Sequence, residues 1–150
     1  MAEIRRARRE DLDAIVALLA DDPLGSSRET ISDPPAPEYV SAMEAIEFDP
    51  NQFLGVMVDG EEVIGTLQLT FIQGLSRRGL KRGLVEAVRI ASSRRSEGLG
   101  ARMFEWAIEE CRKRGCKIVQ LTTDRTRTDA HRFYDRLGFE PSHIGYKLML

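Results

Sequence analysis

The first half of the chain alternates between helical spacing and strand-like runs of apolar residues. Apolar positions three and four residues apart predict one helix that opens at Asp11 and covers 12–19, and a second over 40–46. Residues 21–37 hold four of the six prolines and therefore predict a loop. The short stretch at 4–7 is typical of a first strand.

A β-hairpin is predicted next. The apolar runs 53–58 and 63–71 flank Asp59 and Gly60. Asp-Gly supplies the left-handed backbone that a tight turn between two strands requires. A basic loop that contains glycine then leads into another predicted strand over 84–90.

Strands and helices alternate in the second half. From Gly98 onward the apolar residues fall on one face of a helix that Gly115 ends, and a buried strand follows over 118–122. Residues 129–137 predict a short helix. The chain then closes with a predicted strand over 145–150.

Together these elements predict an α/β fold in which helices flank a mixed central sheet. A length of 150 residues is common for one domain, so we expect a single domain over 1–150. Hydrophobic residues make up 42% of the chain and the net charge is −2. This ordinary composition gives no reason to expect a nucleic-acid or membrane partner.

Long apolar stretches and metal ligands are both scarce. No apolar run approaches the ~18 residues of a membrane span, and the N-terminus lacks the apolar stretch of a signal peptide, so we expect a cytoplasmic protein. The only histidines are His131 and His143, and two cysteines are too few for a zinc site or a disulfide framework. We expect no metal, and buried free thiols at Cys111 and Cys116.

The segment from Arg95 to Gly100 has the composition of an anion-binding turn. It connects a strand to a helix, and such a junction aims free backbone N–H groups and the positive helix end at one point. Gly98 and Gly100 lack side chains that would keep an anion from the backbone. A pyrophosphate is the ligand we expect, although Arg-x-x-Gly-x-Gly by itself is equally compatible with an ordinary helix start.

A second motif follows over 129–139, with the sequence Asp-Ala-His-Arg-Phe-Tyr-Asp-Arg-Leu-Gly-Phe. The two motifs, in this order and with a strand between them, resemble those of the GNAT superfamily of N-acetyltransferases. The matching positions are Arg95, Gly98, Gly100, Ala130, Tyr134, Gly138 and Phe139. The resemblance covers essentially the whole chain. It implies a mostly antiparallel twisted sheet flanked by helices, with a splayed parallel strand pair at the coenzyme site.

The resemblance also implies an enzyme that transfers an acetyl group from acetyl-CoA to an amine. The backbone of Val88, Arg89 and Ile90 would imitate a sheet partner for the pantetheine arm. A turn would wrap the pyrophosphate, with coenzyme contacts from Arg94, Arg95, Ser96, Glu97, Gly98, Leu99, Gly100 and Ala101.

Glu97 is an awkward member of this turn because a carboxylate repels a dianion. We expect its side chain to turn to solvent, with Arg94 and Arg102 offsetting its charge.

Tyr134 is the residue that the resemblance places beside the thioester sulfur. There it would donate a proton or a hydrogen bond to the departing CoA thiolate; simple packing of an aromatic ring is the alternative. Many family members have Asn three positions before the alanine of the second motif, where this chain has Arg127. Either Arg127 takes over a coenzyme contact, or Asp124 makes it, or the contact is missing.

Glu86 is the candidate general base, because a lysine-like amine is mostly protonated at pH 7 and must lose a proton to react. It is the only carboxylate on its strand. From strand parity with Val88 and Ile90, we expect it to lie among apolar neighbours, buried enough to serve as the base. The alternatives are an ion pair with the basic loop before it, which holds Arg77, Arg78, Lys81 and Arg82, and deprotonation relayed by water.

The acceptor amine is not specified by the sequence. In the family its site is lined by a loop and the second helix, here about residues 21–45. Acidic residues of this segment could attract a cation; they are Asp21, Asp22, Glu29 and Asp33.

Two other functions compete with an enzyme. A catalytically silent acyl-CoA-binding module would need neither Tyr134 nor Glu86. A DNA-associated regulator could use the arginine clusters, but the net charge and the lack of a helix-turn-helix pattern count against it. We also expect a homodimer, because Phe71, the hairpin and the last strand would leave an apolar edge in so small a domain.

Overall fold

The computed structural model of the protein describes residues 2–150, which divide into two compact units. The first unit ends at Gln120 and the second begins at Leu121. We describe each unit by itself, and the single domain expected over 1–150 stays a prediction.

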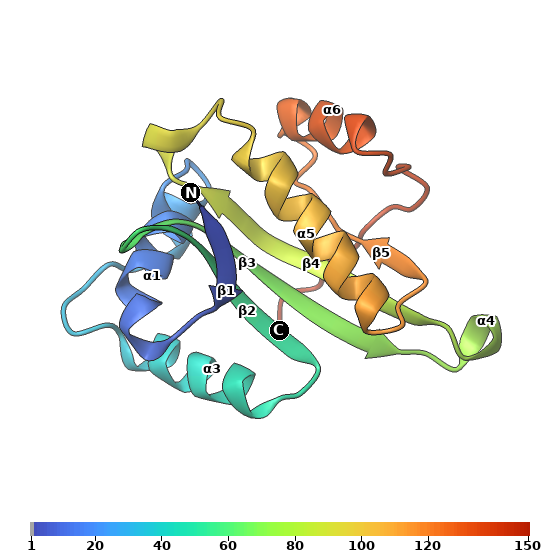
Figure 1. The fold of residues 1–150 in the computed structure, drawn as a ribbon, viewed down its shortest axis with the longest axis horizontal. Coiled ribbons are helices and arrows are strands. Elements are labelled where there is room, and N and C mark those ends of the chain that lie inside the picture. The colour runs from blue at the N-terminus through green and yellow to red at the C-terminus, as the bar shows by residue number, and fades with distance from the viewer. Residues whose placement is uncertain (1) are drawn as a thin grey trace. The chain divides into compact units, whose positions relative to one another are not determined.

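The first unit is built on one mixed sheet. Among the described residues its strands are β1 (Glu3–Arg6), β2 (Gln52–Asp59), β3 (Glu62–Gln73), β4 (Lys81–Ile90) and β5 (Ile118–Gln120). The strands lie in the order β1-β2-β3-β4-β5 (Figure 1). Pairing is antiparallel from β1 to β4, whereas β4 and β5 run parallel. A mixed sheet with one parallel pair confirms the predicted fold class.

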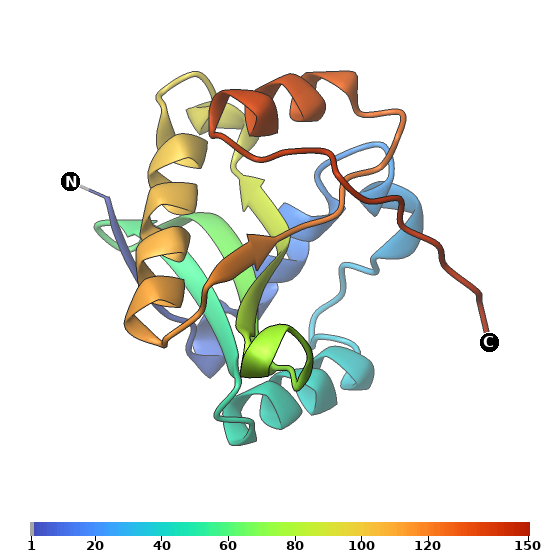
Figure 2. The same cartoon turned by 90° about the vertical axis from the view of Figure 1, so that its right-hand side faces the viewer.

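Helices cover both faces of this sheet. The described helices of the first unit are α1 (Leu12–Ala20), α2 (Gly25–Arg28), α3 (Pro37–Phe48), α4 (Ser76–Gly79) and α5 (Leu99–Lys113), with 3₁₀ turns η1 (Arg9–Asp11) and η2 (Ser92–Arg94). Helix α5 lies on one face, and α1 and α3 lie on the other (Figure 2). The helix expected over 12–19 is therefore α1, the helix expected over 40–46 is α3, and the predicted loop between them includes the short α2.

The two faces have separate cores. On the α5 face, the rings of Phe53 and Trp106 lie 5.1 Å apart, and a methyl group on Gly83 would collide with Cys111 Sγ. On the other face, Val56 and Val58 of β2 belong to a buried cluster with residues of α1 and α3, namely Leu12, Ile15, Val16 and Met43. Because alternate residues of a strand point to opposite faces, β2 contributes to both cores.

The hairpin forms where the sequence predicted it. Asp59 pairs with Glu62, and Gly60 takes the left-handed conformation with φ of 61°. The next strand begins at Lys81, earlier than the residue 84 expected, because the basic loop contracts to the single turn of α4.

The thiols are free and buried, as expected. Cys111 lies on α5, and Cys116 lies in the turn after it. Burial raises the pKa of Cys111 to about 12, so its thiolate is scarce at neutral pH.

The second unit contains α6 (Thr128–Arg136), which begins one residue before the predicted helix and is followed by Gly138 with φ of 92°. The strand predicted over 145–150 is wrong. These residues have no regular structure, and Tyr146 and Leu148 are 91% and 85% exposed. A strand needs a neighbour for its backbone groups, and residues 121–150 include no other strand.

One residue of the apolar edge that we expected for a homodimer is not exposed. Phe71 is buried, with the Arg114 guanidinium 4.3 Å from its ring centroid. Phe71 therefore contributes no exposed surface, and the homodimer stays a prediction.

A buried ion pair holds the N-terminal strand to the start of α1. Arg5 donates from Nη1 and Nη2 to the two carboxylate oxygens of Asp11, at 2.8 and 3.1 Å. The backbone N–H of Arg8 donates to the same carboxylate at 2.7 Å. Asp11 is only 5% exposed, so these bonds replace the water that it loses. The Arg5 guanidinium and the Arg8 amide, acting against burial, lower the pKa of Asp11.

We predict that Asp11→Asn lowers the free energy of unfolding by about 1–3 kcal/mol at pH 7, because bonds to a charged carboxylate are lost. A lowered folded-state pKa stabilises the fold above the ordinary carboxyl range, and that stability disappears as the pH falls through the folded pKa. The difference between wild type and variant in urea unfolding should therefore shrink toward pH 2. Glu10→Gln, an exposed neighbour, is the control. A difference that stays constant from pH 7 to pH 2 would contradict this account.

Candidate active site

A β-bulge interrupts β4 in the middle of the predicted coenzyme strand. Thr66 of β3 pairs with Arg89 and Gln68 pairs with Glu86. Two residues of β4, Ala87 and Val88, therefore stand opposite the single residue between Thr66 and Gln68. Ala87 has φ of 53°, a left-handed conformation that costs a residue other than glycine about 1–2 kcal/mol.

The bulge changes which face Glu86 occupies. Thr66 and Gln68 share a face of β3, so their partners Arg89 and Glu86 share it too. Ile90 lies on the α5 face, since a methyl group on its partner Gly65 would lie 2.9 Å from Ile90 Cδ1 and 3.4 Å from Met103 Cε of α5. The expected parity between Glu86 and Ile90 is therefore wrong.

A further expectation for Glu86 is wrong, and one of the alternatives to its role as a base does not hold. Its side chain is exposed rather than buried among apolar neighbours. It also forms no ion pair with a described residue, so it does not fix the basic loop of Arg77, Arg78, Lys81 and Arg82. Gln68, directly opposite, joins Thr70 in donating hydrogen bonds to Gln52 Oε1, at 3.0 and 3.1 Å. Glu86 thus lies opposite a polar network on β2 and β3 that we did not predict.

The outer edge of β4 is open beside the bulge. The parallel ladder joins Arg82–Leu84 to Ile118–Gln120 and extends no further, whereas β4 continues to Ile90. Within the described part of the first unit, the backbone from 85 to 90 therefore has no strand on that side. Such an edge can bind an extended, amide-rich molecule as an additional strand.

Arg89 connects this strand to the loop after α1. Its Nε lies 3.3 Å from Asp22 Oδ2, and its Nη1 donates to Val88 O at 2.9 Å. Asp22 Oδ1 accepts the amide of Gly25 at the start of α2. Both ion-pair side chains are largely buried, with 19% and 14% exposed. The Arg89 side chain is thus already engaged within the protein, whereas the carbonyl of Val88 keeps a second lone pair for another donor.

The turn from Arg94 to Ala101 leaves backbone donors free at the start of α5. Gly98 precedes the helix with φ of 75°, and no side chain caps this end. The N–H of Arg102 donates to Gly98 O at 3.2 Å. The amides of Leu99, Gly100 and Ala101 come before that first helical bond, so they lack an acceptor within the helix. Together with the positive end of the helix dipole, this geometry suits an anion.

Glu97 is exposed, as expected, and it is paired with Arg94. Its carboxylate accepts two hydrogen bonds from Arg94, at 2.9 and 3.2 Å, and Arg94 Nη2 also lies 3.0 Å from Asp59 Oδ2 in the hairpin. Both carboxylates raise the pKa of Arg94, with Glu97 the larger cause. Arg102, which we also expected to offset the charge of Glu97, instead donates to Ala2 O at 3.0 Å. Arg94 thus offsets the charge of Glu97, as expected, and Arg95 is exposed at the turn.

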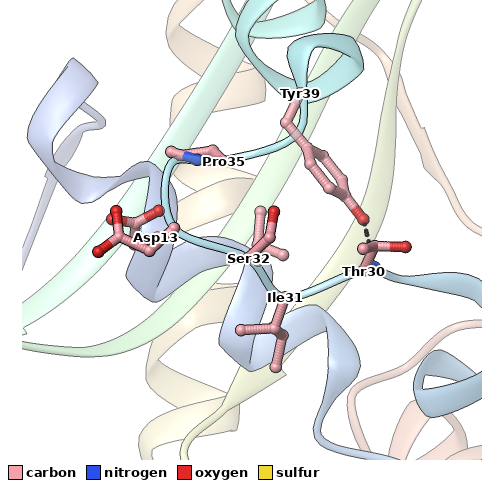
Figure 3. A pocket seen from close by; sticks show the side chains of 8 residues that line it. Asp13, Thr30, Ile31, Ser32, Pro35 and Tyr39 are labelled. Atoms are coloured by element: carbon pink, nitrogen blue, oxygen red, sulfur yellow. Dashed lines mark hydrogen bonds between the residues drawn. The ribbon is translucent and has the colours of Figure 1, made fainter.

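A cavity of about 300 Å³ lies in the segment expected to bind the acceptor (Figure 3). Its lining comprises Asp13, Val16, Thr30, Ile31, Ser32, Asp33, Pro35 and Tyr39. Tyr39 donates to Glu29 Oε1 and accepts the amide of Thr30, both at 2.9 Å. Of the four acidic residues expected to attract a cation, Asp33 lines this cavity, Glu29 binds Tyr39 and Asp22 binds Arg89. The cavity contains none of the predicted coenzyme or catalytic residues.

The second motif forms one helix in the second unit. The half-buried ring of Tyr134 lies 5.5 Å from that of Phe133 and 6.1 Å from that of Phe139. Asp124 accepts the amide and hydroxyl of Thr126, at 3.0 and 2.6 Å, and so shapes the turn before α6. Arg127 immediately precedes α6, is exposed, and accepts the amides of Ala130 and His131 through its carbonyl. Of the two residues that could replace the family's Asn in a coenzyme contact, Arg127 and Asp124, the Arg127 guanidinium is therefore the more available.

Residues 2–150 contain neither a metal-binding cluster nor a membrane-spanning helix. No group of three or more His, Cys, Asp or Glu side chains is placed to hold a metal ion, and no helix is long and apolar enough to cross a membrane.

Comparison with known proteins decides the family. A model of the acetyltransferase (GNAT) family matches residues 12–139. The chain belongs to this family. An aminoalkylphosphonate N-acetyltransferase of Salmonella typhimurium is 28% identical over 146 residues, which cover 97% of this chain and 90% of that protein. The GNAT family and this relative identify the protein as an acetyltransferase.

Solved structures agree with the GNAT fold. A putative acetyltransferase from Agrobacterium tumefaciens has a TM-score of 0.83 with 24% identity, covering 99% of each chain. A protein named a transcriptional regulator, from Bacillus halodurans C-125, has a TM-score of 0.97 and is 44% identical over 100% of both chains.

We predict that Gly98→Ala weakens binding of CoA, the coenzyme of the GNAT family, more than Gly60→Ala does. Both glycines have positive φ and no protein atom within 4 Å of an added methyl group, so both variants should lose a similar ~1 kcal/mol of stability. Only the methyl at position 98 would occupy the space in front of the free α5 amides. Calorimetric titration with CoA measures the difference, and equal affinities would remove the anion site from this turn.

Proposed function

We propose that this GNAT protein is an acetyl-CoA-dependent N-acetyltransferase that transfers the acetyl group to a primary amine of a small molecule or peptide. The observation that carries the proposal is the open edge of β4, which leads into a turn with free amides at the start of α5. CoA has the matching order, because its extended pantetheine arm is joined to a pyrophosphate.

In this proposal the backbone of Val88, Arg89 and Ile90 binds the pantetheine arm. The free amides of α5 and the exposed Arg95 bind the pyrophosphate. Arg94 and Glu97 act by holding the turn in shape, since each already binds the other. Arg127 supplies a further contact to the coenzyme.

The chemical step is a direct attack on the thioester. The nitrogen of a neutral amine forms a bond to the acetyl carbon, and the C–S bond then breaks. Glu86, exposed on the sheet face beside the bulge, accepts a proton from the amine directly or through water. Tyr134 donates to the departing CoA thiolate. Water-relayed deprotonation without Glu86 is the alternative.

The name of one relative suggests a class of acceptor. The Salmonella relative is named for aminoalkylphosphonates, which carry a primary amine and a phosphonate. We therefore place an aminoalkylphosphonate among the first acceptors to be tried. A homodimer and a cytoplasmic location remain part of the proposal.

A regulator of transcription is the second candidate, because the Bacillus halodurans relative has that name. The arginine clusters of this chain are an argument for that function. However, Arg5, Arg89 and Arg94 are each paired with a carboxylate, which lowers their value for binding phosphates. An electrophoretic shift of DNA at physiological salt would favour the regulator.

The direct test is an amine screen that reads thiol release from acetyl-CoA. The panel includes aminoalkylphosphonates, polyamines, aminoglycosides, amino acids and lysine peptides. We expect at least one class to accelerate release above the rate with water. If none does, while CoA still binds, the silent acyl-CoA-binding module becomes the better explanation.

Tyr134→Phe should lower kcat about 10²–10⁴-fold without weakening acetyl-CoA affinity, because the thiolate develops only in and after the transition state. Steady-state kinetics and a direct binding titration separate the two quantities. Tyr146→Phe, which removes a hydroxyl from an exposed residue, is the control. Wild-type kcat in Tyr134→Phe would make Tyr134 a packing residue.

Glu86→Gln should lose most activity near pH 7 and keep most of it near pH 10, where the acceptor amine is already neutral. The pH dependence of kcat/KM with the best acceptor measures this change. Glu62→Gln removes another exposed carboxylate of the sheet and should leave the profile unchanged. If Glu86→Gln has the wild-type profile, deprotonation relayed by water is the better account.

A further inference from the structure

Arg82 shares a sheet face with Glu86. It pairs with Ile72 on β3 and with Ile118 on β5. Residues 82, 84 and 86 precede the bulge, so their side chains lie on one face of β4. At about 3.3 Å per residue, the Cα atoms of Arg82 and Glu86 are ~13 Å apart, and their long side chains can approach each other across that span.

The Arg82 guanidinium has no partner in the described protein. Its Nε is buried without a hydrogen bond, and no ion pair involves it. A buried donor without an acceptor is destabilising and uncommon. The Nε of Arg89, the other arginine on this face, is also buried without a hydrogen bond to a described residue, but Arg89 forms an ion pair with Asp22 and donates to the carbonyl of Val88. Arg82 is therefore the cation on this face that lacks an anion.

In the described part of the chain, Glu86 is an anion without an ion pair, just as Arg82 is a cation without one. It is an exposed carboxylate without an ion-pair partner among residues 2–150, on the same face of the same strand as Arg82. Leu84 lies between the two charges on β4, and Gln68, opposite Glu86, and Thr70, opposite Leu84, add polar side chains from β3 beside them. The face therefore carries one positive and one negative group, with an apolar residue between them and hydrogen-bonding side chains on the neighbouring strand.

We infer that the acceptor is a zwitterion, with its amine at Glu86 and an anionic group held by Arg82. This inference rests on the proposed function. The planar fork of an arginine matches carboxylate, phosphonate and phosphate oxygens with two parallel hydrogen bonds. An amino acid or an aminophosphonate with a short chain between its charges has the required chemistry. Arg82 then determines specificity, whereas Glu86 acts on the reacting nitrogen.

The experiment uses three acceptors with chains of similar length. 2-Aminoethylphosphonate carries a phosphonate, 3-aminopropionate carries a carboxylate, and n-propylamine carries no anion. For each, kcat/KM is measured with the full-length protein at saturating acetyl-CoA. We expect one or both anionic acceptors to exceed propylamine, and the larger value identifies the anion that the site prefers.

The variants test whether Arg82 causes that preference. Arg82→Gln should lower the ratio of kcat/KM for the preferred anionic acceptor to that for propylamine about 10- to 100-fold, mainly through KM. Arg82→Lys keeps the charge but not the fork, and should restore part of the ratio. Lys81→Gln makes the same change in charge on the opposite face of β4, and should keep the wild-type ratio.

A wild-type measurement covers the case in which Arg82→Gln does not fold. Methylphosphonate or acetate should then inhibit acetylation of propylamine competitively, because each occupies the Arg82 position alone. A wild-type enzyme that prefers propylamine, or an unchanged ratio in folded Arg82→Gln, overturns the inference while the acetyltransferase stands. If no amine is acetylated, the proposed function has failed instead.

Discussion

The pairing of β4 is unequal on its two edges. It pairs with β3 from Lys81 to Ile90, interrupted by one bulge, but with β5 only from Arg82 to Leu84. The first edge fixes the strand in the sheet, and the second leaves backbone groups without a strand beside them. The bulge at Ala87 and Val88 also shifts the alternation of the side chains, so that Glu86 shares a face with Arg89 and not with Ile90. The proposed coenzyme site, the position of Glu86 and the face of Arg82 all depend on this one strand.

Side chains far from β4 in sequence support this arrangement. Arg89 reaches Asp22 after α1, and Arg94 joins Glu97 to Asp59 at the tip of the hairpin. On the α5 face, Gly83 allows the helix to approach the strand so closely that a methyl group would meet Cys111 Sγ. The strand is therefore held by a glycine contact on one face and by an ion pair on the other.

Much of this fold could be predicted from sequence, because local signals were strong where the chain turns or forms an amphipathic helix. Asp59 and Gly60 indicated the hairpin, and the spacing after Gly98 indicated α5. The bulge gave no such signal, since Ala87 is neither glycine nor proline and the strand reads as a simple alternation. That single extra residue made the expected face of Glu86 wrong. The strand at 145–150 failed for another reason: an apolar alternation does not supply a pairing partner.

The Arg94 cluster has a consequence for how the turn before α5 responds to its solution. Asp59, Arg94 and Glu97 are 37%, 24% and 43% exposed, so dissolved ions reach all three. The Debye length is about 8 Å at physiological ionic strength and about 3 Å at 1 M salt, and partly exposed pairs weaken accordingly. High salt should therefore weaken the ion pairs that join the hairpin to the turn. The buried contact between Gly83 of β4 and Cys111 of α5 involves no charge, so salt should not weaken it.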